Sequence, residues 1–461
     1  MLKKSRSILI YMLLLGINTQ IFCQQEKVVQ IVNAQSMSSL AGHSDVQRLI
    51  GNVILSDSAV TMYCDSAYYY ASNKMDAFSN IRIVQNNGNF QINSEILNYD
   101  ANLKQAELHR NVVLKDQDMT LKTQDIYYDL RTGIASYNDS AHIVNKETVI
   151  TSRRGQYYKN DKILHFQKRV RINDPQYRIR SDTVHYHTVT KVAYFFGPTN
   201  ILTDKDSIYC ERGWYNTIDE SSHLYRNPFV ISEGRRIQAD TLTYLKSSGF
   251  GRAINNVVII DTSQNAIVKG NFATYSPDKE NATVTDSALM IQVSEGDSLF
   301  IHADTIRSDM DSTGKYRMLK AYYKVRMFRR DLQGKCDSLC YSSVDSTLQF
   351  HGTPVLWADS SQLTAEYIQM YMVNKKIDRM ELRNSAFLVS RDDSTKYTQV
   401  KGKTMMGYFV DGEMQKLVVR GNGQTLYYPK DEEGYIGMNR TTSTDVVIYM
   451  KETKWKTSFC W

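Results

Sequence analysis

Few side chains in this sequence have the types and spacing that a chemical site requires. His185 and His187 are two residues apart, so on an extended strand both would lie on one face, as metal ligands can. Asp309 begins a segment like a calcium loop, but Lys320 stands at the twelfth position, where a bidentate Glu is required. The sequence has no nucleophile elbow, phosphate loop or metalloprotease helix. We therefore predict no catalytic residue, no metal site and no cofactor, and we expect that the protein is not an enzyme.

Acidic residues do recur, with a regularity that indicates architecture. One motif, small residue–polar residue–x–aliphatic–x–Tyr, is clear at 181–186, 239–244 and 336–341. Its polar position falls at Gln35, Asp65, Glu95, Gln124, Arg154, Asp182, Glu211, Asp240, Asn271, Asp304, Asp337, Glu366 and Lys403. Such a repeat predicts stacked supersecondary units, about 13 of roughly 30 residues each. The Asp residues could alternatively be the paired carboxylates of a polysaccharide-active β-helix.

Each unit has the alternation of a strand that turns a corner. Aliphatic and small residues lie three and one positions before the polar residue, whereas aliphatic residues and Tyr lie two and four positions after it. Because side chains alternate along a strand, the inward face must slip by one residue at the polar position. A bulge there would keep both halves facing one interior. A second strand, such as 256–260, completes each unit, so we expect an all-β antiparallel stack.

The start of the chain has the features of an export signal. Lys3, Lys4 and Arg6 precede a short apolar run, which is shorter than a membrane span. We predict a signal peptide at residues 1–23, cleaved near Cys23 and Gln24. Lipid attachment at Cys23 and a retained anchor are the alternatives. Periplasmic localisation follows, with association with the outer membrane left open.

Cysteines and charges add little chemistry. Cys64, Cys210 and Cys336 occupy the small position of the motif, so we interpret them as core residues. Cys336 and Cys340 have the spacing of one strand face. The formal net charge of +7 is dispersed apart from a basic stretch at 168–180, which has no recognised nucleic-acid-binding module. We therefore expect no nucleic-acid partner.

The units quoted above resemble the OstA-like family, which includes the lipopolysaccharide-bridge protein LptA, its relative LptC and the N-terminal region of LptD. The resemblance covers residues 28–428, and the segments 421–428 and 437–439 look like the longer OstA-like proteins of Bacteroidetes. It implies an elongated, repetitive antiparallel β-jelly roll over residues 24–428. Residues 429–461 would be an irregular C-terminal tail or a further partial unit.

The resemblance also implies a function. The expected protein is a periplasmic bridge that carries the lipid A acyl chains of lipopolysaccharide toward the outer membrane. Its partners would be LptC-like and LptD-like proteins bound through terminal strand edges, with end-to-end self-association as another use of those edges. Apolar chains gain about 25 cal/mol per Å² on leaving water, so an apolar groove can bind a lipid tightly.

The aliphatic positions of the motif are the candidates for that groove. They are Ile92, Leu97, Leu121, Ile126, Ile179, Val184, Ile208, Ile237, Leu242, Val268, Ile301 and Ile306. An ordinary packed core is the alternative interpretation of the same residues. Arg169, Arg171, Arg178 and Arg180 are candidates to meet lipid phosphates, or they form a solvated face. The competing function is a non-catalytic structural or adhesive β-solenoid that uses its outer face.

Overall fold

The computed structural model describes residues 29–57, 60–85, 88–276, 281–294, 297–310, 313, 317–358, 360–374, 376–432, 434–451 and 454–460, and the side chains of those up to Met450. The predicted signal peptide, residues 1–23, lies outside this part of the chain. Every regular element in the described residues is a β-strand. Among these residues no helix is long and apolar enough to cross a membrane.

The strands form two compact units. The first contains the described residues up to Gln117 together with Tyr128–Arg131, and the second contains Asp118–Tyr127 and the chain from Thr132 onward. The first unit consists of β1 (Gln30–Asn33), β2 (Ser36–Leu40), β3 (His43–Asp57), β4 (Val60–Tyr70), β5 (Lys74–Gln85), β6 (Phe90–Asp100), β7 (Gln105–Asp116) and the end of β8 (Met119–Asp129).

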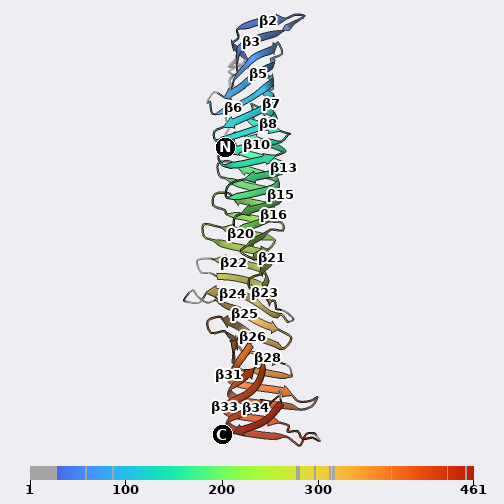
Figure 1. Ribbon diagram of the computed structural model, residues 1–461, viewed down its shortest axis with the longest axis vertical. Helices are drawn as coiled ribbons and strands as arrows, with labels where there is room; N and C mark the ends of the chain where they lie inside the picture. Colours follow the sequence, from blue (N-terminus) through green and yellow to red (C-terminus); the bar gives the residue numbers. More distant parts are fainter. Residues whose placement is uncertain are drawn as a thin grey trace, which may run out of the picture. The chain divides into compact units, whose positions relative to one another are not determined.

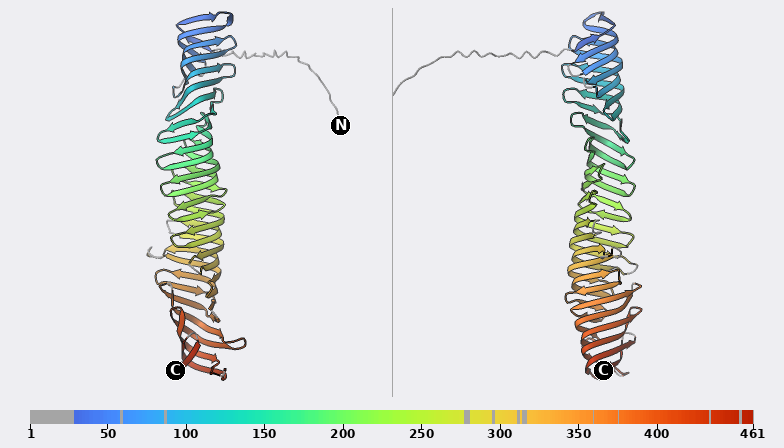
Figure 2. Two further views of the ribbon diagram at one scale, coloured as in Figure 1. Left: turned by 45° about the vertical axis from the view of Figure 1, so that its right-hand side comes forward. Right: turned by 90° about the vertical axis from the view of Figure 1, so that its left-hand side faces the viewer.

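The second unit begins with β8 and continues to the end of the described chain. Its strands are β9 (Ile134–Tyr137), β10 (Ala141–Asn145), β11 (Thr148–Ser152), β12 (Arg154–Tyr158), β13 (Ile163–Asn173), β14 (Tyr177–His187), β15 (Val192–Thr203), β16 (Asp206–Asn216), β17 (Ser222–Tyr225), β18 (Phe229–Ser232), β19 (Arg235–Gln238), β20 (Thr241–Leu245), β21 (Phe250–Asp261), β22 (Ala266–Ser276), β23 (Asn281–Gln292), β24 (Leu299–Met310), β25 (Arg317–Phe328), β26 (Leu332–Ser342), β27 (Thr347–His351), β28 (Val355–Ala358), β29 (Ser361–Thr364), β30 (Tyr367–Val373), β31 (Lys376–Arg391), β32 (Tyr397–Val410), β33 (Glu413–Tyr427), β34 (Asn439–Lys451) and β35 (Lys454–Cys460). Figure 1 shows these strands stacked in chain order within the unit, and the views of Figure 2 show them as successive rungs.

Neighbouring strands pair antiparallel, and most long pairs change register near their middle; β32–β33 shifts a second time near one end. In the β4–β5 pair the shift lies between Tyr63 and Ser66 and passes Asp65, the predicted polar position. On β5 the facing residues Ser79 and Asn80 both have positive φ, 65° and 53°. A bulge of this kind bends the strand and lets its two halves face one interior. The predicted all-β antiparallel jelly roll with a corner at the polar position is confirmed.

A side-chain contact recurs at these corners. The Nδ2 of Asn80 donates to Asp65 at 2.7 Å. The same asparagine-to-carboxylate contact joins Asn111 to Glu95, Asn227 to Glu211, Asn256 to Asp240 and Asn384 to Glu366. Asn tolerates the left-handed conformation better than most residues and supplies the donor. The repeated carboxylates are therefore corner residues held by asparagine.

One corner lies a residue earlier than the sequence predicts. The N–H of Arg153 donates to the carbonyl of Lys168, the contact that Glu211 and Asp240 make at their corners. Arg153, not Arg154, is therefore the corner residue of this repeat. As a consequence Tyr157 is buried and Tyr158 is half-buried on the outer face. The sequence motif places the polar position one residue too late because Arg153 and Arg154 are the same residue type, and only the strand pairing shows which of them occupies the corner.

The positions of the cysteines follow from the same alternation of inward and outward side chains and its slip at the corner. Cys64, Cys210 and Cys336 are buried free thiols, as expected of small core residues, and burial raises their pKa to about 12. The prediction that Cys336 and Cys340 share one face is wrong. Leu339 pairs with buried Ala321, so Cys340 lies on the opposite, outer side. The corner at Asp337 slips the inward face between the two cysteines.

The two ends of the described chain differ in how they end the sheet. Each of β1 and β2 pairs with β3 and, in the described residues, with no other strand. Residues 439–451 and 454–460 form β34 and β35, and β34 pairs with β33, so the sheet continues into the segment after residue 428.

Candidate functional site: the interior of the stack

Two rows of inward side chains line the interior, one from each half of the bent strands. On the strands that carry the motif, we call the inward residues before the corner the A row and those after it the B row. On the intervening antiparallel strands the order is reversed, so that Ile172 after the corner belongs to the A row and Phe166 before it to the B row. In the second unit the A row runs through directly paired residues Leu121, Ile143, Ile150, Ile172, Ile179, Ile201, Ile208, Val230, Ile237, Ile259, Val268, Met290 and Ile301. Each pair of neighbours is joined across strands, so the row is a continuous aliphatic ladder.

The B row is built in the same way. It runs through Phe166, Val184, Phe195, Gly213, Leu224, Leu242, Ala253, Ala273, Val284 and Ile306. The twelve predicted groove residues are distributed over these two rows and their counterparts in the first unit. Ile92 and Leu97 are fully buried there, and Ile126 is buried on β8. The structure thus places all twelve side chains toward the interior.

From β8 to β16 the interior is closed. Leu121, Ile179 and Val184 are almost without solvent exposure, as are the intervening A-row residues, and Ile208 is buried at the end of this stretch. We call β8–β16 the closed stretch. The predicted groove residues Leu121, Ile126, Ile179, Val184 and Ile208 are all buried in this stretch.

From β18 to β23 the A row is not closed. Its five consecutive members in this stretch, Val230, Ile237, Ile259, Val268 and Met290, are all half-buried. Beyond it Ile301 and Ile306 on β24 are buried again. We call β18–β23 the open stretch. Solvent reaches its inward aliphatic side chains although they belong to the same ladder.

The two stretches differ in their B-row side chains, which are Phe166, Val184, Phe195 and Gly213 on β13–β16 but Leu242, Ala253, Ala273 and Val284 on β20–β23. In the closed stretch β13 and β15 place Phe166 and Phe195 in the B row. In the open stretch β21 and β22 place Ala253 and Ala273 there. Because each strand folds over at its corner, the two rows of one strand face each other. Alanine leaves the facing side chains with fewer packing partners, so the interior of the open stretch is less filled.

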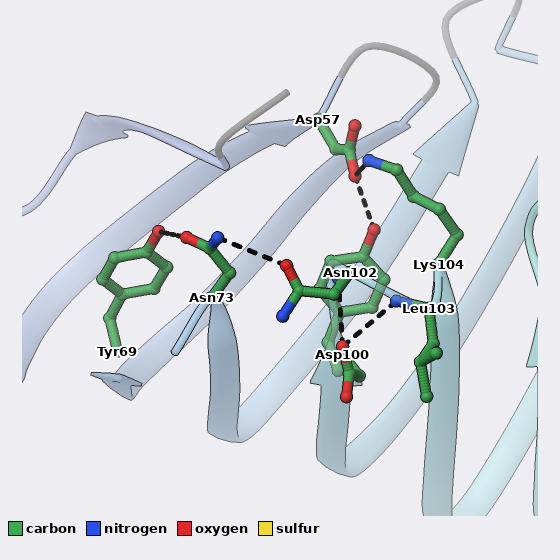
Figure 3. Close-up of polar contacts among 8 residues, drawn as sticks. Asp57, Tyr69, Asn73, Asp100, Asn102, Leu103 and Lys104 are labelled. Atoms are coloured by element: carbon green, nitrogen blue, oxygen red, sulfur yellow. Dashed lines mark hydrogen bonds and ion pairs between the residues drawn. The ribbon is translucent and has the colours of Figure 1, made fainter. Parts of the chain in front are cut away.

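The free ends of the two halves meet along a seam, which is closed in the first unit by a buried polar contact. Tyr99 donates its hydroxyl to Asp57 at 2.5 Å, and the Nζ of Lys104 lies at the same distance from that carboxylate. Figure 3 shows Lys104 beside Asp57. Burial, together with the bond to Asp57, raises the pKa of Tyr99. A buried carboxylate with two donors can remain in an apolar interior.

Turn residues beside this seam also contact one another between successive repeats of the first unit. Asn73 donates to the side chain of Asn102 at 3.3 Å, and Asp100 accepts the N–H groups of Asn102 and Leu103 (Figure 3). These contacts satisfy the backbone N–H groups of the turn at Asn102 and Leu103.

Aromatic side chains close the seam of the closed stretch. Tyr177 and Tyr215 contact each other with ring centroids 6.2 Å apart. Tyr186 and Thr217 are buried beside them. Burial raises the pKa of Tyr177 and Tyr186, while hydrogen bonds with Thr217 oppose that shift in both. The phenols are thus paired as well as buried, which is how tyrosine is accommodated in a core.

The equivalent tyrosines of the open stretch have no such cover. Tyr215 is 2% exposed, whereas Tyr244 and Tyr275 at the same position of the motif are 41% and 46% exposed. On the A-row side the end of the strand carries an ion pair between Arg235 and Asp261, N to O 2.9 Å. Both lie two residues beyond A-row members, Ile237 and Ile259, on the same face. The seam of the open stretch is therefore lined by exposed phenols and one charged pair.

Asp261 is ionised at any ordinary pH. Its burial favours the neutral form, but hydrogen bonds from Ser263 and Arg235 outweigh that effect and lower the pKa of Asp261 to about 2. The side chain of Arg235 is half exposed beside it. The mouth of the open stretch thus holds a cation and an anion that are both charged at neutral pH.

The histidines do not form a metal site in the described structure. His185 stacks on His165 of the neighbouring strand with ring centroids 3.6 Å apart. Nδ1 of His187 accepts the N–H groups of Val189 and Thr190 in the following turn. In the part of the chain that the structure describes, no group of three or more His, Cys, Asp or Glu is placed to hold a metal ion. Burial, with a contribution from His165, lowers the pKa of His185 to about 4.

The other chemical candidates have structural partners. Asp309 accepts from Arg307 at 2.6 Å and from Lys320 at 3.2 Å. The four arginines of the basic stretch are exposed on the outer face of β13 and β14. They do not point into the interior.

Three residues of the open A row were missed by the sequence motif: Val230, Ile259 and Met290. They lie on the strands between the motif strands, which carry no polar position and no tyrosine. Apolar runs such as 256–260 were the available signal. Only the register shows that these residues join Ile237 and Val268 in one row.

Comparison with known families fits this architecture. Residues 25–182 match the family described as OstA-like protein. Over these residues the match confirms the predicted resemblance to the OstA-like family. The match supports a family of transport type, not a family of enzymes, and it covers the first unit and the beginning of the second. No curated protein matches the chain.

Proposed function

We propose that this OstA-like protein carries the acyl chains of lipopolysaccharide against the A row of the open stretch, as part of a periplasmic bridge toward the outer membrane. The observation that carries the proposal is the run of five half-buried aliphatic side chains, Val230 to Met290, in an otherwise closed ladder. An acyl chain that covers them recovers about 25 cal/mol per Å² of apolar surface. Non-catalytic carriage needs nothing else from the interior.

The mouth of the open stretch supplies a place for a charged head group. Arg235 lies two residues from the A-row member Ile237 on the same face, and its partner Asp261 leaves half of the Arg235 side chain exposed. Guanidinium groups bind phosphate oxygens with two parallel hydrogen bonds. We assign to Arg235 the contact with a lipid phosphate, in place of the four exposed arginines of β13 and β14.

Partners are proposed for the first edge of the sheet. In the described residues β1 and β2 pair only with β3, and the side chains of β1 are exposed. An unpaired edge accepts a strand from another chain. We assign this edge to LptC-like or LptD-like proteins, or to a second copy. Insertion of Pro after Val32 should abolish that association and leave the far-ultraviolet circular dichroism unchanged; unchanged association would exclude this edge.

Site-specific photo-crosslinking tests the lipid proposal. A crosslinking amino acid is placed at Ile237 in the open stretch, at Ile179 in the closed stretch and at Thr243 on the outer face. We expect capture of lipid A-containing species at Ile237 and little at the two controls. Equal capture at Thr243 would mean non-specific adsorption and would exclude the open stretch as the site.

Mass spectrometry of organic extracts provides an independent test. The protein is purified gently from its own host, and its extract is compared with that of an Ala253→Leu/Ala273→Leu variant. Leucine at these B-row positions should fill the space opposite Ile259 and Val268. We expect near-stoichiometric lipid A from the natural protein and a several-fold loss in the variant. A clean extract from the natural, folded protein would favour the structural solenoid.

A further inference from the structure

The outer face of the sheet half that bears the A row is apolar over β21–β25, which overlaps the end of the open stretch. Outward residues Ile260, Ile267, Ile291, Phe300 and Phe328 follow one another as direct cross-strand neighbours on β21–β25. Ile231 extends this line on β18, separated from Ile260 by Arg236. We call these residues the outer stripe. An antiparallel sheet with one solvated face normally carries polar residues there, so this composition is unusual.

The outer stripe is accessible to solvent. Phe328 is 51% exposed, Ile231 39% and Phe300 36%. The rings of Phe300 and Phe328 lie side by side with centroids 6.3 Å apart. In the closed stretch the corresponding outward positions are mixed, with polar Asn173, Arg178 and Ser207 beside apolar Val144, Val149 and Leu202. A contiguous exposed apolar surface on a folded protein marks an interaction site.

The charges within the outer stripe and in the outward row nearer the corner are all positive. Arg236 lies within the stripe, with its guanidinium 4.2 Å from the ring centroid of Phe229. The outward row nearer the corner contributes Lys269 and Arg326, each exposed, and contains no carboxylate between Phe229 and Arg326. On the other side of the stripe lie exposed Glu233, two residues beyond Ile231, and exposed Arg330, two residues beyond Phe328. Two copies meeting through this face would bring cations against cations, which costs free energy. The surface therefore fits an anionic, apolar partner better than a second copy.

We propose that the outer stripe docks this protein on an anionic lipid bilayer. Isoleucine and phenylalanine side chains enter the boundary between head groups and acyl chains, while Arg236, Lys269 and Arg326 extend toward lipid phosphates. Basic residues near an anionic membrane surface each contribute attraction that salt screens. The proposal concerns the outer face alone and does not depend on lipid in the interior.

Vesicle flotation tests this docking. The full chain is mixed with vesicles of phosphatidylcholine, or of phosphatidylcholine with 30% phosphatidylglycerol. Since every variant carries the same N-terminal segment, that segment contributes equally to all. We expect binding to the anionic vesicles that falls at least about tenfold in the Phe300→Ser/Phe328→Ser variant. Tyr194 and Phe196 are exposed on the outer face of the sheet half that bears the B row. A Tyr194→Ser/Phe196→Ser variant should therefore bind normally.

A second variant keeps the test independent of folding defects in the first. Lys269→Gln/Arg326→Gln changes only exposed charges and should reduce binding severalfold, as should 0.5 M salt in the natural protein. Absence of binding by the natural chain, or equal loss in the Tyr194/Phe196 control, overturns the proposal. So does a crosslinker at Phe328 that captures an acidic protein or a second copy while vesicles are ignored.

Discussion

The closed stretch β8–β16 and the open stretch β18–β23 are made from the same repeating unit, yet solvent reaches the A row only in the second. Both have bent strands, a corner with left-handed residues and a continuous aliphatic ladder. They differ in what faces that ladder, Phe166 and Phe195 in one and Ala253 and Ala273 in the other. A repeat can therefore conserve its backbone while local side-chain volume decides between core and binding surface.

The seam should show the largest difference between the stretches. Tyr215→Ala removes a buried ring from the closed seam and should cost about 3–5 kcal/mol of unfolding free energy. Tyr275→Ala removes a ring that is already half exposed and should change stability by less than about 1 kcal/mol. Urea denaturation followed by tyrosine fluorescence compares the two. Equal losses would mean that the seam is closed in both stretches.

The A row should show the next largest difference. Ile179→Ala leaves a cavity in the closed stretch and should cost about 2–5 kcal/mol. Ile237→Ala in the open stretch should cost less than half of that, because water already contacts this side chain. Peptide-resolved hydrogen exchange localises each effect, since stacked units need not unfold together. A larger effect at Ile237 would contradict the open interior.

The phenol at the seam sharpens the comparison further. Tyr99→Phe removes one donor from buried Asp57 and should cost about 1–2 kcal/mol, while Lys104 keeps the carboxylate partnered. Tyr244→Phe should be neutral, since that tyrosine is exposed. Thermal unfolding measured side by side gives both values. Neutrality of Tyr99→Phe would show that the contact with Asp57 is not part of what closes the seam.

Acid should distinguish the stretches by the smallest effect. The pKa of His185 is lowered to about 4 from 6.5, so folding favours the neutral ring; its contribution is present above pH 6.5 and is lost as pH falls toward 4. The pKa of Asp261 is lowered to about 2 from 3.8, so its contribution persists down to pH 3.8 and is lost below it.

Hydrogen exchange at pH 7, 5 and 3.5, corrected for intrinsic rates, should therefore show β13–β14 loosening before β19–β21. His185→Gln should remove part of that early loosening. Simultaneous loosening of both regions between pH 7 and 5 would contradict these assignments.

Much of the architecture could be predicted from local patterns. The alternation about Asp240, with Ile237 before it and Leu242 after it, is enough to place a corner, because a strand has only two faces. The same reasoning identified Cys64 and Cys210 as core residues. This reasoning failed at Arg153 and Arg154, because two neighbouring arginines both fit the polar position. It also failed at Cys340, because the inward face slips by one residue between Cys336 and Cys340.

The sequence by itself determined the repeated bent strands and the aliphatic rows, because both depend on side-chain alternation over a few residues. Which part of the interior is open was decided only by the tertiary structure. Closure of the seam depends on contacts such as Asp57 with Tyr99 and Tyr177 with Tyr215, between residues about 40 positions apart in the chain. In the open stretch, Arg235 and Tyr275 occupy the motif positions of Tyr177 and Tyr215, so the motif alone does not distinguish a closed seam from an open one. The outer stripe likewise exists only through register, since Ile260, Ile291 and Phe328 are neighbours on paired strands and not along the chain.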